Sequence, residues 1–235
     1  GVNLAKIPFQ PRHRQPGKPI RLLSACTLVD YKGVANTIRA VSLARRSRPR
    51  LRLTIFGSGP QEKQIKELIK ELKLNQVVFL KPFLAWEKLI KACGRYQLFL
   101  HPSYTTPDNK QEGIPTSLIE RVAAGMPVIA TRHADIPEIV KDGINGYLVP
   151  QNNVQALADK LITLANEPER WRQFGQNGRK LVVKSFDAVK QTAIRERLYA
   201  SLIAGNVSGK YVGSGSAAGR RWRFFPARPD DSNNS

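Results

Sequence analysis

Two glutamates flank a short turn near the middle of the chain. Glu112 precedes Gly113, Ile114 and Pro115, and Glu120 follows in an apolar stretch with helical spacing. Proline suits the first position of a helix, so the free backbone amides beside it favour an anion. Carboxylates accept hydrogen bonds from sugar hydroxyls. Either glutamate alone is an ordinary solvated charge, but the pair predicts a ligand with phosphate between hydroxyl-bearing groups, such as a nucleotide sugar.

The loops after the first two predicted strands supply further candidates. Lys32 and Gly33 stand where a helix begins, and glycine there permits a close approach to the backbone. Taken alone, Lys32 is equally well a solvated surface lysine. Gly59 lies in a turn before Pro60 that lacks the third glycine of a dinucleotide-binding fingerprint. This turn is either a tight entry into a helix or a loop that contacts a ligand.

Short apolar runs alternate with helical patterns along the chain and must position these residues. Strands are expected at residues 21–26, 51–56, 76–80, 97–101, 127–131 and 146–149. Helices are expected at 34–45, 60–73, 85–93, 115–124 and 135–140, with two or three more between 153 and 204. This alternation predicts an α/β fold with a doubly wound, Rossmann-like parallel sheet covered on both faces. Ligands of such sheets bind beyond the carboxyl ends of the strands.

The composition divides the chain into three parts. Residues 1–19 carry four prolines and no periodicity, which predicts an extended lead-in. Residues 20–204 are expected to form the nucleotide-sugar-binding domain, and residues 205–235 a disordered basic tail. Aromatic side chains among the tail arginines leave a nucleic-acid or membrane contact open as an alternative. The start at Gly1, in a segment typical of the middle of a protein, indicates a piece of a longer chain.

The 235-residue chain is strongly basic. Its 38 Lys and Arg exceed its 18 Asp and Glu, which gives a formal net charge of +20. Such an excess favours an anionic partner, whether nucleic acid, an acidic membrane surface or a phosphorylated small molecule. A solvated basic surface without a dedicated partner explains the charge equally well. No uncharged apolar run reaches the roughly 18 residues of a membrane span.

The sequence contains no recognisable metal-binding motif. Cys26 and Cys93 are far apart, the three histidines are scattered, and no D-x-D pair occurs. This pattern favours a reducing compartment and argues against a disulfide framework or a zinc site. A metal that neutralises a diphosphate is therefore unsupported, and Lys32 with a helix terminus would have to replace it.

In these motifs the chain resembles the C-terminal, donor-binding half of a GT-B glycosyltransferase of glycosyltransferase family 4. Glu112 and Glu120 match the E-x7-E motif of that family, and the likeness covers residues 1–204. The matching stretches are GVNL, LVDYKGV, LTIFGSGP, VVFL, LFLHPSYTTPDNKQEGIPTSLIE and AAGMPVIATRHADIPEIVKDGINGYLVP. The stretches TPDNKQEGIP and TRHADIPE most resemble the branch that makes exopolysaccharides such as colanic acid.

The resemblance implies a role for each candidate residue. Lys32 would bind the donor diphosphate, Glu112 the hydroxyls of the transferred sugar, and Glu120 the ribose. Glu112 and Lys32 would thus act at the reacting centre, and the loop after the third strand would present backbone groups to the base. The other implied donor-binding residues are Gly33, Gly59, Leu80, Lys81, Gly113, Ile114, Pro115 and Thr116.

The resemblance also implies a reaction. The family transfers a hexose from a nucleotide sugar to a glycan or lipid-linked acceptor, with retention of anomeric configuration and without a metal or other cofactor. The acceptor-binding N-terminal domain of such enzymes is missing from this sequence. We expect a cytoplasmic enzyme that binds peripherally to the inner face of an anionic membrane. We expect no nucleic-acid partner.

Two positions depart from the family pattern. Cys26-Thr27 stands where the family usually has Gly-Arg, so one of two cations for the diphosphate is missing, and Lys81 stands where glycine is common. Loss of one charge-assisted contact costs roughly 1.5–3 kcal/mol. Two other functions therefore stay open. One is a fragment that binds nucleotide and transfers nothing, and the other is a polyanion-binding module driven by the basic charge.

Overall fold

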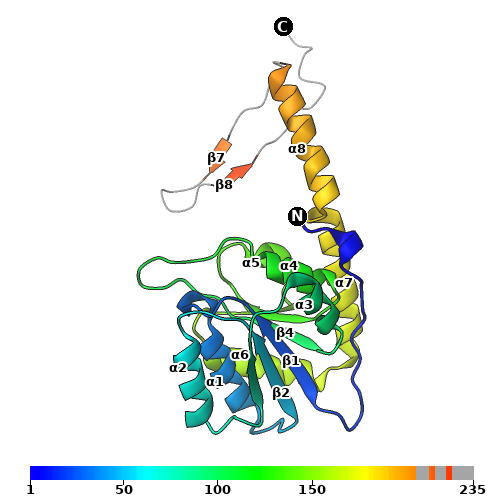
Figure 1. Ribbon diagram of the computed structural model, residues 1–235. Coiled ribbons are helices and arrows are strands. Elements are labelled where there is room, and N and C mark those ends of the chain that lie inside the picture. Colours follow the sequence, from blue (N-terminus) through cyan, green and yellow to red (C-terminus); the bar gives the residue numbers. More distant parts are fainter. Residues whose placement is uncertain (205–211, 215–220, 224–235) are drawn as a thin grey trace. The chain divides into compact units, whose positions relative to one another are not determined.

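Six parallel strands form one sheet (Figure 1). Their order is β3 (Val78–Lys81), β2 (Leu51–Phe56), β1 (Ile20–Ala25), β4 (Leu98–His101), β5 (Val128–Thr131) and β6 (Gly146–Val149). The computed structural model describes residues 1–204, 212–214 and 221–223. The strand order reverses between β1 and β4, and the loops after these two strands meet at the switch point where doubly wound sheets bind ligands. The predicted fold class is confirmed.

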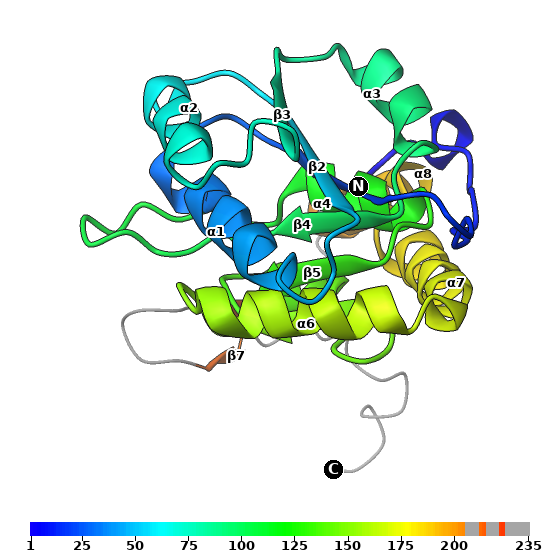
Figure 2. The same cartoon turned by 90° about the horizontal axis from the view of Figure 1, so that it is seen from below.

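Helices cover both faces of the sheet because successive strand residues point to opposite sides. In β1, Leu22 belongs to one hydrophobic core and Leu23 to the other. Figure 2 shows α1 and α2 on one side of the strands and α3 and α7 on the other. The first core is closed by α1 (Val34–Ala44), α2 (Glu62–Glu71) and α6 (Val154–Asn166). The second core is closed by α3 (Trp86–Cys93), α4 (Thr116–Ala123) and α5 (Ile136–Ile139). Helix α7 (Glu169–Ser185) contributes Trp171 and Phe174 to the first core and Val182 to the second.

The predicted element boundaries agree with the structure to within two residues around the candidate site. The strand expected at 76–80 is Val78–Lys81, and the helix expected at 60–73 is Glu62–Glu71. Ile65, Leu68 and Ile69, at helical spacing, form the buried face of that helix. Hydrophobic periodicity was therefore a sufficient guide to these elements.

The prediction that Pro115 occupies the first helical position is wrong. Pro115 has φ −72° and ψ 115°, and the helix α4 begins one residue later, at Thr116. The proline ring fixes φ near the helical value but leaves ψ free. Pro115 therefore enters the helix from an extended conformation and acts as the N-cap residue.

The first residues of the chain pack against the second core. Val2 and Ile7 are buried, and the 3-10 helix η1 (Leu4–Lys6) lies between them. Arg179 of α7 donates a hydrogen bond of 2.9 Å to the carbonyl oxygen of Ile7. The lead-in is thus tied to the domain by buried side chains and by its backbone.

Two compact units are recognised, Gly1–Ala188 and Val189–Ser235. Helix α8 (Ala188–Ile203) starts at their boundary, and β7 (Val212–Ser214) pairs antiparallel with β8 (Arg221–Arg223). The predicted disordered tail, 205–235, otherwise falls outside the described residues. No helix in the described part of the chain is both long and apolar enough to cross a membrane.

Candidate functional site

The loop after β1 brings Lys32 to the carboxyl edge of the sheet. Lys32 ends the 3-10 helix η2 (Asp30–Lys32), and Gly33 has φ 66° and leads directly into α1. A Cβ at Gly33 would lie 2.0 Å from the carbonyl oxygen of Pro102, which follows β4. Glycine is required here because two loops pack backbone against backbone. The backbone that approaches Gly33 closely is thus that of the protein's own loop at Pro102.

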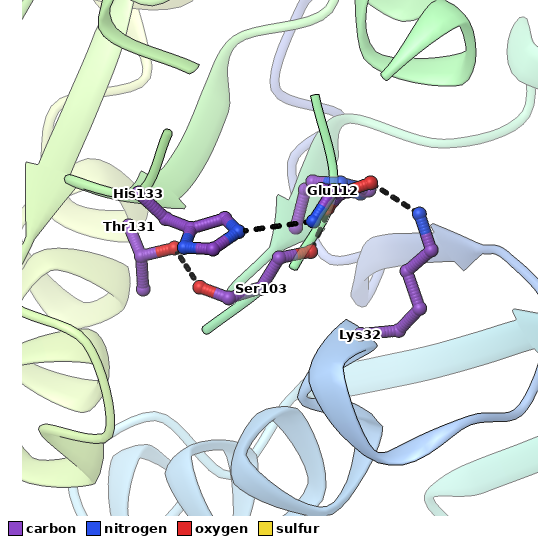
Figure 3. Close-up of polar contacts among 6 residues, drawn as sticks. Lys32, Ser103, Glu112, Thr131 and His133 are labelled. Carbon is purple, nitrogen blue, oxygen red and sulfur yellow. Dashed lines mark hydrogen bonds and ion pairs between the residues drawn. The ribbon is translucent and has the colours of Figure 1, made fainter. Parts of the chain in front are cut away.

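The carboxylate of Glu112 connects the loop after β1 with the end of strand β4 (Figure 3). Its Oε2 forms an ion pair with Lys32 Nζ, and its Oε1 lies 2.8 Å from Nε2 of His101, the last residue of β4. Ser103 Oγ lies 3.2 Å from the same His101 nitrogen. The side chain of Glu112 is only 7% exposed. The carboxylate is therefore fixed in position by buried polar partners.

His133 holds the backbone of the loop that carries Glu112. The N–H of Glu112 donates to His133 Nε2 at 3.4 Å, so the proton of the neutral ring resides on Nδ1, which faces Thr105 Oγ1. Burial lowers the pKa of His133, although nearby Glu112 acts in the opposite direction. Thr131 of β5 donates to the carbonyl oxygen of Ser103 and joins a third strand end to this cluster (Figure 3).

The environment keeps Glu112 ionised. Burial alone would raise its pKa, but hydrogen bonds and charges from His101 and Lys32 outweigh burial and lower the pKa to about 2. A group whose pKa is lowered on folding stabilises the folded protein above its unfolded pKa, and this stability is lost as the pH falls through the folded pKa.

This shift predicts a pH-dependent effect of Glu112→Gln. The folded pKa of about 2 lies below the usual value of 4.5, so the ionised carboxylate favours folding at neutral pH. The difference in unfolding free energy between wild type and Glu112→Gln should shrink by about 2 kcal/mol from pH 7 to pH 3. Urea unfolding across this range measures it. A difference that does not change with pH would contradict the assigned network.

Glu120 is held by two side chains at a second point of the same edge. Trp86 Nε1 donates to its Oε1 at 2.7 Å, and Arg121 Nη1 donates to its Oε2 at 3.1 Å. Glu120 is 8% exposed and Arg121 is 1% exposed, so the two charges pair inside the protein. Each carboxylate oxygen retains a second lone pair for another donor.

Lys32 and Glu120 line the same pocket, which has a volume of about 280 Å³. Glu112 does not line this pocket but reaches its edge through the ion pair with Lys32. The structure therefore brings together the three charged residues that the sequence analysis singled out. The remaining lining residues are Ala25, Cys26, Thr27, Phe56, Phe83, Leu84, Trp86, Leu89, Ser117 and Arg121.

The start of α4 offers backbone donors beside these carboxylates. In the part of the chain that the structure describes, the N–H groups of Thr116 and Ser117 donate no hydrogen bond. Thr116 is exposed and lines an adjoining pocket of about 290 Å³ together with Glu120. A Cβ at Gly113 would meet nothing within 4 Å, and Ile114 is 42% exposed. This turn and helix start are thus open to an anion.

Gly59, Leu80 and Lys81 do not line the pocket, and neither do Gly33 or the predicted residues 113–116. A Cβ at Gly59 would lie 2.6 Å from the carbonyl oxygen of Leu28, so this glycine allows two loops to pack. Leu80 and Lys81 end β3, and the carbonyl of Lys81 accepts a hydrogen bond of 3.1 Å from the N–H of Gly57. The loop and helix after β3 reach the pocket instead through four later residues: Phe83, Leu84, Trp86 and Leu89.

Sequence reasoning missed the side chains that hold the two glutamates. His101 ends β4 and His133 follows β5 by two residues, so the rule that ligands bind beyond strand ends could have found both. Arg121 is adjacent to Glu120 but had no distinguishing pattern. Trp86 and Glu120 are joined only by tertiary packing, and no spacing in the sequence links them.

Comparisons with known proteins find related sequences and structures. The model of the family described as glycosyl transferases group 1 matches residues 6–181. WcaL of Escherichia coli strain K12, named as a colanic acid biosynthesis glycosyltransferase, is 35% identical over 166 residues. The matched region is 70% of this chain and 40% of WcaL. The chain thus spans less than half the length of this relative.

Solved structures show the same fold. The C-terminal domain of the glycosyl transferase group 1 protein LpcC from Francisella tularensis matches with a TM-score of 0.68 and 22% identity, over 80% of this chain and 100% of that domain. HepE of Anabaena, solved with UDP-glucose, matches with a TM-score of 0.71 and 21% identity, over 85% of this chain and 56% of HepE. Since the family model covers most of its length, the chain belongs to the glycosyl transferases group 1 family and forms the C-terminal half of a GT-B fold.

Proposed function

We propose that this chain is the donor-binding half of a glycosyltransferase that transfers a hexose from a nucleotide sugar to a glycan or lipid-linked acceptor during polysaccharide synthesis. The observation that carries the proposal is that Lys32 and Glu120 line one pocket while Glu112 pairs with Lys32. The colanic acid role in the name of WcaL supports a polysaccharide product, and the complex of HepE with UDP-glucose supports the class of donor.

Each charged group then has a distinct task. Lys32 has three N–H donors and uses one on Glu112, so the others are available to the donor diphosphate. The N–H groups of Thr116 and Ser117 add positive dipole ends near the same phosphates. Negative charge grows on the diphosphate as the sugar departs, and fixed donors stabilise that charge without a metal. Transfer with retention at the sugar carbon is part of the proposal.

The two glutamates hold hydroxyl groups in this scheme. Glu120 accepts hydrogen bonds from the ribose, and Glu112 accepts them from the transferred sugar. A glycosidase would need one carboxyl group with a raised pKa to protonate the glycosidic oxygen. The pKa of Glu112 is instead lowered to about 2. Its charge therefore suits ligand binding and not acid catalysis.

Calorimetric titration with UDP-glucose and GDP-mannose tests the proposal. Binding of one of them is expected, and Lys32→Met should weaken it by about 10–100-fold, the cost of one charge-assisted contact. Lys63→Met, on the exposed face of α2, is the matched control and should bind like wild type. Failure of every nucleotide sugar to bind at millimolar concentration would count against the donor site.

A domain that binds nucleotide without transferring sugar is the second candidate. Thr27 lines the pocket at a position where the family usually carries arginine, which supports this alternative. Hydrolysis of the donor, measured with and without an added acceptor-binding half, separates the two candidates. Transfer or hydrolysis favours the enzyme, and binding with neither favours the second candidate.

The proposed site of action is the cytoplasmic face of a membrane. Cys26 and Cys93 are free thiols, as is usual in a reducing compartment. A lipid-linked acceptor would place the enzyme at the bilayer surface, and the net charge of +20 suits an anionic one.

A further inference from the structure

The opposite end of the sheet carries a cluster of basic side chains. Arg14, Lys18 and Arg21 precede or begin β1, and five arginines lie in the turn between α1 and β2 and at the start of β2. We call these eight residues the basic end: Arg14, Lys18, Arg21, Arg45, Arg46, Arg48, Arg50 and Arg52. Segments 11–21 and 44–52, which contain them, hold no Asp or Glu. Positive charge is therefore concentrated here.

Strand pairing brings the two basic segments together. Ile20 pairs with Leu51, and Arg21 with Arg52, at the amino ends of β1 and β2. Arg50 Nη1 donates to the carbonyl of Gly17 at 3.4 Å, which links the turn directly to the lead-in. Residues some thirty positions apart thus form one surface because parallel strands start side by side.

Among the described residues, the arginines of the basic end form no ion pair with an acidic side chain. None of the ion pairs among the described residues includes a member of this cluster. Arg45 Nε and Nη2 both donate to the carbonyl oxygen of Pro49, at 3.2 and 3.1 Å, so one backbone oxygen holds the guanidinium in place. The nearby carboxylate of Glu167 is already paired with Arg170 at 2.9 Å. The cluster therefore retains unneutralised charge and free N–H donors.

A pocket of about 380 Å³ lies within this basic surface. Arg14, Arg48 and Arg50 line it, together with the apolar side chains of Ile20 and Leu51. Guanidinium groups bind phosphate through paired N–H donors. An apolar floor beneath a rim of arginines suits a molecule whose phosphate adjoins an apolar part, as in a phospholipid.

We propose that the basic end is a docking surface for the headgroups of anionic phospholipids in a bilayer. The segments that form it contain no Phe, Tyr or Trp, the side chains on which single-stranded nucleic acids stack. Each basic residue near an anionic bilayer contributes about 1 kcal/mol to the binding free energy, which corresponds to an increase of about fivefold in the partition coefficient. The six residues of β1 separate this surface from the donor pocket by roughly 17 Å. Docking thus leaves the carboxyl edge of the sheet accessible.

Sedimentation of the full chain with lipid vesicles tests this inference. Wild type should bind vesicles of equal parts phosphatidylcholine and phosphatidylglycerol and should not bind pure phosphatidylcholine. The triple variant Arg46→Gln, Arg48→Gln, Arg50→Gln should partition about 100-fold more weakly, from three contributions of about fivefold each. The control variant Lys63→Gln, Lys70→Gln, Lys180→Gln removes the same charge from exposed positions on α2 and α7 and should bind like wild type.

Two results would overturn the proposal. Equal losses of vesicle binding in the two triple variants would show that the total charge of the chain causes the binding. The basic tail, which both variants retain, is part of that total charge. Tighter binding to duplex DNA than to anionic vesicles at the same salt concentration would assign the surface to nucleic acid. Inorganic phosphate should compete only weakly if a bilayer is the partner, and full competition would indicate a site for soluble anions.

The test does not depend on sugar-donor binding. Both triple variants should keep the wild-type melting temperature and the wild-type response to nucleotide sugars. If the triple variant does not fold, Arg48→Gln alone replaces it, because no hydrogen bond from the Arg48 side chain occurs among the described residues. About fivefold weaker partitioning is then expected, and no change would contradict the inference.

Discussion

Gly33→Ala should lower the melting temperature of the protein by about 6–12 °C. The substitution is expected to reduce the free energy of unfolding by roughly 3 kcal/mol, and each kcal/mol lowers the melting temperature of a domain of this size by about 2–4 °C. Two penalties combine. Gly33 has φ 66°, a left-handed conformation that costs an L-residue about 1–2 kcal/mol. The added Cβ would also lie 2.0 Å from the carbonyl oxygen of Pro102, so the loop after β4 must move.

Two other glycines separate these penalties. Gly17 has φ 75°, and a Cβ added there would meet nothing within 4 Å, so Gly17→Ala should show only the conformational cost. Gly113 has open space and is outside the left-handed region, so Gly113→Ala should melt within about 2 °C of wild type. Calorimetry of the three variants measures the series. If Gly33→Ala melts like Gly17→Ala, the contact with Pro102 does not constrain the site.

Glu120→Ala should weaken the binding of free UDP by about 10–100-fold, because charge-assisted hydrogen bonds contribute roughly 1.5–3 kcal/mol. Both oxygens of Glu120 are oriented, by Trp86 and by Arg121, and each can accept one more hydrogen bond. Free UDP contains the ribose that we assign to Glu120 but lacks the sugar that we assign to Glu112. Glu112→Ala should therefore change UDP binding by less than about threefold and weaken UDP-glucose more strongly.

The comparison of these two variants needs a control for folding. Removal of Glu120 leaves the buried Arg121 without a counter-charge, which destabilises the domain. Glu120→Gln retains the volume and one acceptor oxygen, so it should fold better while still losing affinity for UDP. Calorimetric titrations of variants with wild-type circular dichroism spectra decide the question. Equal losses of UDP affinity in the Glu112 and Glu120 variants would contradict the ribose assignment.

The position of the candidate site could be predicted from the sequence because strand ends are local features. The pattern of short apolar runs located β1 and β4, and parallel strands place their following loops at one edge. Lys32 and Glu112 follow these two strands, and the structure joins them in an ion pair. The error at Pro115 has a local cause too, since its ring fixes φ and not ψ.

The position of His101 and His133 beside strand ends is visible in the sequence, but their contacts with Glu112, and that of Trp86 with Glu120, could not be predicted in the same way. Trp86 reaches Glu120 from another helix, and His101 and His133 reach Glu112 from two different strand ends. The sequence shows each residue only beside its chain neighbours. The distances between them depend on strand order and on the path of each loop.

The amino-acid sequence by itself determined the α/β class, the positions of the strands and the E-x7-E segment, because hydrophobic periodicity and motif spacing are encoded within short stretches. Only the tertiary structure decided which groups neutralise Glu112 and Glu120. It also decided that the arginines after α1 join the basic residues before and at the start of β1 in a single basic end. The physical reason is that charge pairing and surface clustering act through space, between segments that the parallel sheet brings together.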